Sequence, residues 1–467
     1  MKKPFLSSLL FCLFTLFTFS LRAQDVAITA DFKKATVARL SDAINERYVF
    51  PDVAKATGEH LQKQLSAGVF NKYTDLKAFA DALTAEVQSI NHDKHMRIRP
   101  LPPREAPPDT PERMIEDQLV QQAQMRENNA GFREVKKLDG NIGYLDLRGF
   151  ASPDWGAPMA DAYMKLLATS DAIIIDLRKN GGGSPEMVQY LCSYFFDKHV
   201  HLNSLYWREG DETREFWTLD KVGGQKMPEV PLFILTSNYT FSGAEEFSYN
   251  MQTQRRATLI GETTGGGANP GGGVPLNDKL MVFIPTGRAI NPITKTNWEG
   301  VGVVPEVMTT ADEALEKGVD LAKEAAEEFR QKNKEKNTVL FKNLTASLEN
   351  YTANSTHEPV FNSLKKCLDA GLLDEPAINQ MGYDYLMQHQ KPTTAEVIFK
   401  CNTLLFPVSA NVFDSYGEAL ATNGKLEESL KSYQKAVELA EASNDPNLPL
   451  FKENRKKAAE KAKAGKP

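Results

Sequence analysis

The sequence predicts an α/β core, a mixed sheet flanked by helices, with a helical bundle before it and an all-helical region after it. Strand-like and helix-like segments alternate between residues 142 and 261, which is typical of a sheet with parallel strands. Apolar residues follow helical spacing through residues 29–100, and the chain is almost wholly helical from about residue 310. A chain of 467 residues is therefore expected to contain more than one domain.

Residues 1–23 predict a signal peptide. Lys2 and Lys3 precede an apolar stretch, Pro4–Leu21, and the segment Leu21-Arg22-Ala23 forms a cleavage site. An uncleaved membrane anchor is the alternative for this segment. After cleavage no segment is long and apolar enough to span a bilayer, so we expect an exported protein without a stable membrane anchor.

Charge and cysteine content restrict the partners and the location. A net charge of -6 gives no electrostatic basis for binding nucleic acid. The three cysteines that follow the signal peptide, Cys192, Cys367 and Cys401, are too few and too widely spaced for a disulfide framework or a zinc cluster. An exported protein of this kind suits a bacterial periplasm or the cell exterior.

Residues 29–100 are predicted to form an N-terminal bundle of about three short helices. Phe50-Pro51-Asp52 and Asn71-Lys72 interrupt the helical pattern, and the bundle ends at residues 91–96. The proline-rich segment Leu101–Pro111 can sustain neither a helix nor a central strand. Residues 101–139 are therefore predicted to be a linker, too short to contain a PDZ domain.

Residues 140–309 are predicted to form the α/β core. Helices are expected near Pro158–Ala168, near Pro185–Phe196 and directly after Ser242. Strands are expected, in chain order, at Ile142–Leu147, Ala172–Leu177, Leu232–Thr236, Thr258–Gly261, Leu280–Pro285 and Val301–Val307.

Residues 310–467 are predicted to be all-helical, with a repeat between about residues 379 and 444. Gly382 aligns with Gly417 and Phe399 with Tyr433, at a period near 34–35 residues. The small and aromatic positions resemble those of a tetratricopeptide (TPR) repeat, which would bind a protein partner or substrate. A plain helical hairpin is the alternative.

Ser242 is the first candidate for catalysis. It follows the predicted strand Leu232–Thr236 and precedes a predicted helix, where free backbone amides and the positive helix end would stabilise an oxyanion. An ordinary N-cap serine is an equally good interpretation of this segment alone.

Three other segments carry groups that such a serine needs. Gly181 and Gly182 follow a strand, where backbone amides can approach a reacting group. His95 lies at the end of the bundle and could act as a base, and Glu299 could orient a histidine. Taken singly, a turn, a structural histidine and a solvated glutamate are the simpler interpretations. His199 and His201 form an HxH pair without a third metal ligand.

Together these segments resemble the S41 family of serine peptidases, the C-terminal-processing or tail-specific proteases. The resemblance covers about residues 31–306 and is greatest to the branch that contains tricorn protease and interphotoreceptor retinoid-binding protein. Five segments occur in the family's order: Asp93-Lys94-His95, the Asp-x-Arg-x-Asn-Gly-Gly stretch from Asp176, Ser242-Gly243-Ala244-Glu245, Gly261–Gly267, and Glu299–Pro305. The implied core has a ClpP/crotonase-like fold.

The resemblance implies Ser242 as the nucleophile, with the amides of Gly243 and of the Gly181-Gly182 turn as the oxyanion hole. Many members use a lysine about 25 residues after the serine, but the corresponding stretch here, residues 264–268, contains none. The tricorn-like alternative, a Ser-His-Glu triad, places His95 and Glu299 beside Ser242. Lys94 departs from that pattern, because tricorn has a serine before the histidine.

The resemblance thus implies an exported serine endopeptidase that acts on protein or peptide substrates without a metal or organic cofactor. The alternative is a catalytically inactive S41-like module that binds an apolar ligand or a protein partner. The presence of serine, histidine and glutamate together favours the enzyme.

Overall fold

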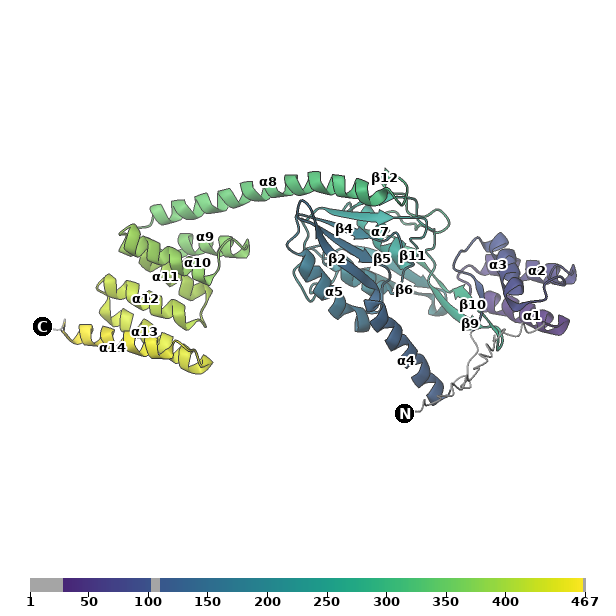
Figure 1. The fold of residues 1–467 in the computed structure, drawn as a ribbon, viewed down its shortest axis with the longest axis horizontal. Helices are drawn as coiled ribbons and strands as arrows, with labels where there is room; N and C mark the ends of the chain where they lie inside the picture. The colour runs from purple at the N-terminus through teal and green to yellow at the C-terminus, as the bar shows by residue number, and fades with distance from the viewer. Residues whose placement is uncertain (1–27, 102–109, 465–467) are drawn as a thin grey trace, which may run out of the picture. The chain divides into compact units, whose positions relative to one another are not determined.

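The computed structural model describes residues 28–101 and 110–464, so the predicted signal peptide lies outside the described residues. The chain divides into two compact units, Met1–Ala326 and Glu327–Pro467. Figure 1 shows the helices and strands of both units.

The first unit begins with a bundle of three helices, α1 (Ala30–Arg47), α2 (Pro51–Ser66) and α3 (Leu76–Asn91). The side chains of Thr29 and Asp75 cap α1 and α3 by accepting backbone N–H bonds, and α2 begins with a proline. The buried side chains of the bundle include those that the helical spacing predicts, namely Val37, Leu40, Ile44, Phe79, Leu83 and Val87.

A small antiparallel sheet joins the bundle to the rest of the unit. It contains β1 (Ile98–Pro100), β10 (Leu280–Pro285) and β9 (Gly271–Pro275), in the order β1-β10-β9. Val282 and Ile284 of β10 are buried in the same cluster as the bundle helices. The loop of residues 92–97, which carries His95, is therefore held between α3 and this sheet.

The central sheet of the first unit has the order β12-β8-β7-β4-β3-β2. The strands β3, β4, β7, β8 and β12 are parallel, and β2 is antiparallel to β3. Their bounds are β2 Phe132–Leu138, β3 Ile142–Leu147, β4 Ala172–Asp176, β7 Leu232–Thr236, β8 Thr258–Gly261 and β12 Val307–Met308. This mixed sheet agrees with the fold class predicted from the sequence.

Helices cover both faces of the central sheet. One face packs against α5 (Pro153–Leu167), which contacts α6 (Pro185–Ser193), and α6 in turn contacts α7 (Gly243–Thr253). The other face packs against Ala314, Ala322 and Ala326 at the start of α8 (Ala314–Glu349). Every residue of β4 and β7 is buried, as expected for parallel strands covered on both sides.

A third sheet, in the order β11-β5-β6, was not predicted. It contains β5 (His201–Trp207), β6 (Glu212–Trp217) and β11 (Gly287–Ile290), with a short 3-10 helix at Glu209–Asp211. The rings of His199 and His201 stack on Trp217 at 4.8 Å and 4.5 Å between centroids. This stacking gives the HxH pair a structural role.

Two sequence expectations in this unit are wrong. The predicted linker 101–139 contains α4 (Pro111–Glu127), a 3-10 turn (Asn129–Gly131) and β2, so the sheet begins before residue 140. The predicted strand Val301–Val307 is a loop except at Val307. Gly300 and Gly302 have φ angles of 73° and 74°, which an extended strand cannot contain.

The second unit is helical, as predicted, although the first turns of α8 belong to the first unit. Its helices after α8 are α9 Glu358–Asp369, α10 Glu375–Tyr383, a π-helical segment Asp384–Gln388, α11 Pro392–Leu405, α12 Ala410–Thr422, α13 Leu426–Ser443 and α14 Leu448–Ala464.

The two aligned segments of the second unit share one packing contact. A Cβ atom on Gly382 would lie 2.6 Å from the ring of Phe399, and one on Gly417 would lie 3.0 Å from the ring of Tyr433. Both glycines thus let an aromatic ring lie directly on a helix. The assignment of these helices as TPR repeats stays a prediction.

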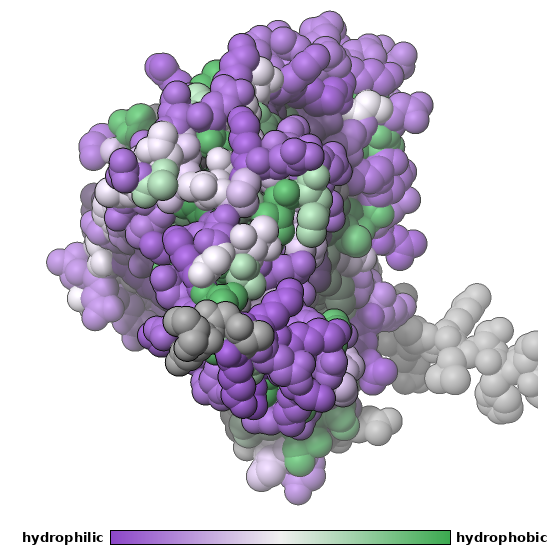
Figure 2. Space-filling model, turned by 90° about the vertical axis from the view of Figure 1, so that its left-hand side faces the viewer, coloured by the Kyte–Doolittle hydropathy of each residue, from purple (hydrophilic) through white to green (hydrophobic). Residues whose placement is uncertain are grey.

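The face drawn in Figure 2 is mostly hydrophilic, with small separate apolar patches. Single apolar residues are normal on a water-exposed surface. Among the described residues, none of the helices has both the length and the apolarity needed to cross a bilayer.

Candidate active site

Ser242 lies at the sharp turn between β7 and α7, with φ 53° and ψ -120°. An ordinary N-cap residue has extended backbone angles, whereas a positive φ is uncommon for a serine. Strained strand-to-helix turns of this kind expose the nucleophile of α/β-hydrolases. Ser242 also lines a cavity. Its backbone angles and its position at the cavity both favour a nucleophile over a simple helix cap.

The glycine turn after β4 packs directly on Ser242. A Cβ atom on Gly182, whose φ is +101°, would lie 2.7 Å from the Gly243 nitrogen and 2.8 Å from the Ser242 Cβ. The Gly182 amide donates to the Asn180 side chain at 2.8 Å, so it is already engaged. Of the predicted oxyanion donors, Gly243 and Gly181 therefore remain, and both line the cavity.

The Glu245 carboxylate holds the Ser242 turn in place through hydrogen bonds. It is buried and accepts hydrogen bonds from the Ser242 amide at 2.9 Å, the Gly266 amide at 2.6 Å and the Gly267 amide at 2.8 Å. It also accepts one from the Thr264 hydroxyl at 2.5 Å. Burial raises the pKa of Glu245, and these hydrogen bonds oppose that shift. The sequence analysis missed this role, although the Ser-x-x-Glu spacing of a capping box pointed to it.

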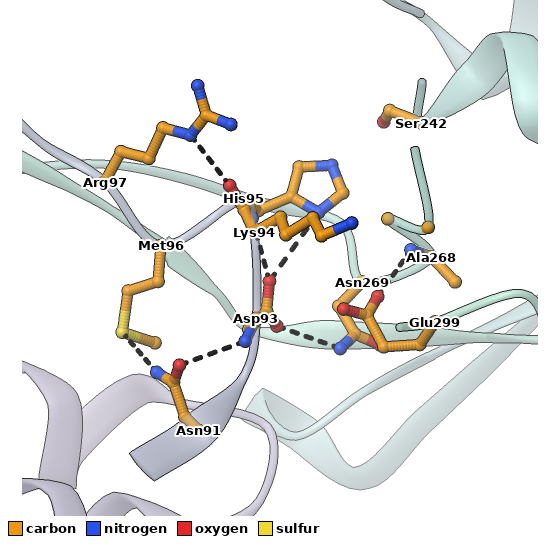
Figure 3. Close-up of polar contacts among 12 residues, drawn as sticks. Asn91, Asp93, Lys94, His95, Met96, Arg97, Ser242, Ala268, Asn269 and Glu299 are labelled. Carbon is orange, nitrogen blue, oxygen red and sulfur yellow. Dashed lines mark hydrogen bonds and ion pairs between the residues drawn. The ribbon is translucent and has the colours of Figure 1, made fainter. Parts of the chain in front are cut away.

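His95 projects into the same cavity from the loop after α3. Its side chain is 10% exposed, and its ring packs against Phe241 at 4.5 Å and Phe283 at 5.7 Å between centroids. Neither ring nitrogen has a hydrogen-bond partner in the described part of the chain. Figure 3 shows the Ser242 side chain facing the side of the loop on which the imidazole lies. A buried imidazole with both nitrogens free is suited to accept a proton.

The carboxylate of Asp93 lies close to the His95 ring, with 3.7 Å between Oδ1 and Nδ1. It is buried and accepts hydrogen bonds from the His95 amide at 3.0 Å, the Asn269 side chain at 2.9 Å and the Tyr48 hydroxyl at 3.3 Å. Asp93 therefore orients the histidine loop. This role of Asp93 was not predicted from the sequence.

Glu299 lies close to the His95 imidazole and to Asp93. Its Oε2 accepts a hydrogen bond from the Ala268 amide at 2.5 Å, and its Oε1 is buried without a hydrogen-bond partner among the residues described. Burial, reinforced by the nearby charge of Asp93, raises the pKa of Glu299 to about 8. The structure thus brings Glu299 close to His95 and Asp93 in a carboxyl–imidazole cluster, in which burial favours the protonated form of Glu299.

The raised pKa predicts a pH-dependent stability. Glu299 binds its proton more tightly in the folded chain than in the unfolded chain, so it lowers stability progressively as pH rises from about 4.5 to about 8. Glu299→Gln removes this effect and should raise the unfolding free energy by about 1–3 kcal/mol at pH 8, but hardly at pH 4. Thermal unfolding of both proteins at the two pH values measures the difference. A gain of equal size at pH 4 and pH 8 would contradict the assignment.

The same three side chains could hold a metal ion. The ligand atoms of Asp93, His95 and Glu299 all lie within 4.8 Å of one another, among the residues described. Ligands of a tetrahedral zinc ion lie closer, roughly 3.4 Å apart, given bonds of about 2.0–2.2 Å. The observed spacing is wider than a bound zinc ion requires, and the contact of 3.7 Å between Asp93 and the imidazole is also longer than a hydrogen bond.

One cavity of about 930 Å³ lies beside Ser242 and His95, and neither Asp93 nor Glu299 is among its lining residues. Ser242, His95, Gly181 and Gly243 all line it, whereas His92 is exposed and lies outside its lining. Aromatic side chains form much of the wall: Trp207, Phe216, Tyr239, Phe241, Phe283 and Trp298. A polypeptide segment has room in a cavity of this size.

Two family models match parts of the first unit. The family model for peptidase family S41 matches residues 141–309, and the model for the N-terminal domain of peptidase S41 in eukaryotic IRBP matches residues 21–137. A carboxy-terminal-processing protease from Bartonella bacilliformis is 25% identical over 176 residues, which are 37% of this chain and 39% of that protein. The chain thus spans well under half the length of this curated relative.

Solved structures with related folds were also found. A putative peptidase from Parabacteroides merdae is 17% identical with a TM-score of 0.45, covering 62% of this chain and 96% of that chain. The photosystem II D1 C-terminal processing protease has 14% identity and a TM-score of 0.38, covering 60% and 94%. For tricorn protease the identity is 15% and the TM-score 0.39, covering 64% and 37%. From the two family models, which together cover residues 21–137 and 141–309, the chain belongs to peptidase family S41.

Proposed function

We propose that this protein is an exported serine endopeptidase in which Ser242 is the nucleophile and His95 the general base. The observation that carries the proposal is that a serine on a strained turn and a buried histidine with both nitrogens free line one cavity. The predicted signal segment supports export to a periplasm or the cell exterior.

The residues fit an acyl-enzyme mechanism. His95 takes the Ser242 proton while the oxygen attacks the substrate carbonyl, and the amides of Gly243 and Gly181 stabilise the resulting oxyanion. His95 then gives that proton to the leaving amine as the peptide bond breaks. Water, deprotonated by His95, releases the acyl group and restores Ser242.

Two carboxyl groups support the imidazole. Asp93 lies nearest to Nδ1 and favours the imidazolium that forms during the reaction. Glu299 completes the proposed Ser-His-Glu triad from behind the ring. Once His95 becomes positively charged, the pKa of Glu299 should fall, because a neighbouring cation favours the ionised carboxyl group.

The second unit has a separate proposed role. Its helices, with the shared glycine–aromatic contact, would bind a protein partner or hold a substrate in the manner of helical repeats. This role does not depend on the chemistry at Ser242.

Hydrolysis of unfolded polypeptide tests the proposal. The purified protein should generate new N-termini in a denatured protein, detected by mass spectrometry. Pretreatment with a fluorophosphonate should stop the reaction, and a metal chelator should leave its rate unchanged. An absence of new termini would favour the alternative, a binding module that uses the aromatic cavity wall. Loss of activity with the chelator would indicate metal-dependent chemistry instead.

A further inference from the structure

Several positively charged side chains line the active-site cavity, although the chain as a whole carries a net charge of -6. Lys94, Arg97, Arg99 and Arg214 line it, against the carboxyl groups of Glu186 and Glu246. Glu186 is paired with Arg214 at 2.9 Å. Glu246 is fully buried, which raises its pKa to about 7 and so weakens its negative charge. The unneutralised positive charge therefore lies with Lys94, Arg97 and Arg99.

Arg97 and Arg99 have no carboxylate partner within the described part of the chain. The Arg97 Nε donates to the Lys94 carbonyl at 3.0 Å, and no other hydrogen bond of its guanidinium group is formed with the described residues. Figure 3 shows this side chain extending away from Asp93, on the side of the loop where the imidazole lies. Both arginines are exposed, so each can form charge-assisted hydrogen bonds with a ligand.

The register of β1 places Arg97, directly before the strand, and Arg99 on the same face. Ile98 of β1 pairs with Val282 of β10, and both are buried in the bundle core. Arg99 pairs with Met281, and Met281 also lines the cavity. Because side chains alternate along a strand, Arg97 and Arg99 lie on the face opposite to Ile98.

The face that carries Arg97 and Arg99 lies next to His95, the proposed base. The Arg97 carbonyl accepts a hydrogen bond from the Phe283 amide at 3.1 Å, and the Phe283 ring stacks against His95. Arg97 therefore lies beside the ring that touches His95, and Arg99 follows two residues further along the strand. Two residues of strand span about 6.6 Å, which is also the spacing of alternate side chains in an extended substrate.

We propose that Arg97 and Arg99 form a subsite for substrate segments with acidic side chains at alternate positions, Glu-x-Glu or Asp-x-Asp. This inference rests on the proposed peptidase function and names its substrate class. Each arginine binds one carboxylate, and the residue between them points to the opposite face. Glutamates at adjacent positions would face opposite sides, so only one of them would reach this wall.

Binding to the Ser242→Ala protein tests the subsite without any hydrolysis. Three fluorescent peptides, capped at both ends, carry Glu-x-Glu, the same two glutamates side by side, or Gln-x-Gln in one background. At low ionic strength we expect Glu-x-Glu to bind about tenfold more tightly than Gln-x-Gln, with adjacent glutamates between them. This preference should shrink as salt is added.

Variants locate the effect. Adding Arg97→Gln and Arg99→Gln should abolish the preference for Glu-x-Glu. The control pair Arg39→Gln and Arg47→Gln removes two positive charges from α1, outside the cavity lining, and should keep the preference for Glu-x-Glu. Because every comparison is a ratio between peptides, a general loss of affinity through the Arg97–Lys94 contact cancels. Thermal unfolding checks that each variant is folded.

Several results would overturn the proposal. These are equal binding of Glu-x-Glu and Gln-x-Gln, equal binding of the two glutamate isomers, or a preference that survives in the Arg97→Gln, Arg99→Gln protein. A preference that follows only a free terminal carboxylate, tested with an uncapped Gln-x-Gln peptide, would also overturn it. A wild-type protein that hydrolyses none of the peptides contradicts the peptidase function instead, whatever the binding data show.

Discussion

Ser242→Ala should lower kcat/KM for peptide hydrolysis by about 10⁴-fold to 10⁶-fold, since it removes the proposed nucleophile that forms the acyl-enzyme. His95→Ala should cost a comparable factor, because the serine hydroxyl is a weak nucleophile without a base. The double variant should be little worse than either single one, since the two residues act as a unit. Steady-state hydrolysis of one fluorogenic peptide by all three proteins measures these effects.

Ser248→Ala is the matched control for Ser242→Ala. Ser248 lies on the same helix, and its hydroxyl donates only to the Ala244 carbonyl at 2.8 Å. It does not line the cavity, so this variant should stay within a few fold of the wild-type rate. A Ser242→Ala protein with activity close to that of Ser248→Ala would contradict the nucleophile assignment.

The second large effect is expected at Glu245, which touches no substrate. Glu245→Gln keeps the size of the side chain but places an NH2 group among donors, three backbone amides and one hydroxyl. At least one buried donor then loses its acceptor, at a cost of about 1–3 kcal/mol. Because these bonds tie the Ser242 turn to the loop beside His95, kcat should fall about 100-fold or more while KM changes little.

Glu246→Gln is the control for Glu245→Gln. The neighbouring carboxyl group is also buried, but its pKa of about 7 means that a neutral amide resembles its protonated form. We expect a much smaller decrease in kcat and little change in the melting temperature. Equal effects at the two positions would show that loss of buried charge, rather than the position of the Ser242 turn, explains the result.

The central strands could be predicted from the sequence because their signals are local. Leu232–Thr236, Thr258–Gly261 and Leu280–Pro285 are short apolar runs between polar turns, and the structure has strands with these same bounds. The strand Gly271–Pro275 begins with three glycines and has no such signal. It is formed by pairing with β10, which no local pattern predicts.

The candidate site shows the same division between local and long-range signals. Ser242 and its helix could be predicted from neighbouring residues, and the resemblance supplied His95 and Glu299. The roles of Asp93 and Glu245 depend on partners far away in the sequence, such as Asn269 for Asp93 and Gly267 for Glu245. The engagement of the Gly182 amide by Asn180 likewise follows from the three-dimensional shape of the turn.

Mapping a fluorophosphonate adduct tests the central claim most directly. The wild-type protein is treated with the probe at neutral pH, digested, and examined by mass spectrometry for the labelled residue. We expect a single adduct on Ser242, no labelling of Ser242→Ala, normal labelling of Ser248→Ala, and labelling of His95→Ala that is slower by orders of magnitude. Labelling that persists in Ser242→Ala, or an adduct at another residue, would contradict the assignment of Ser242 as the nucleophile.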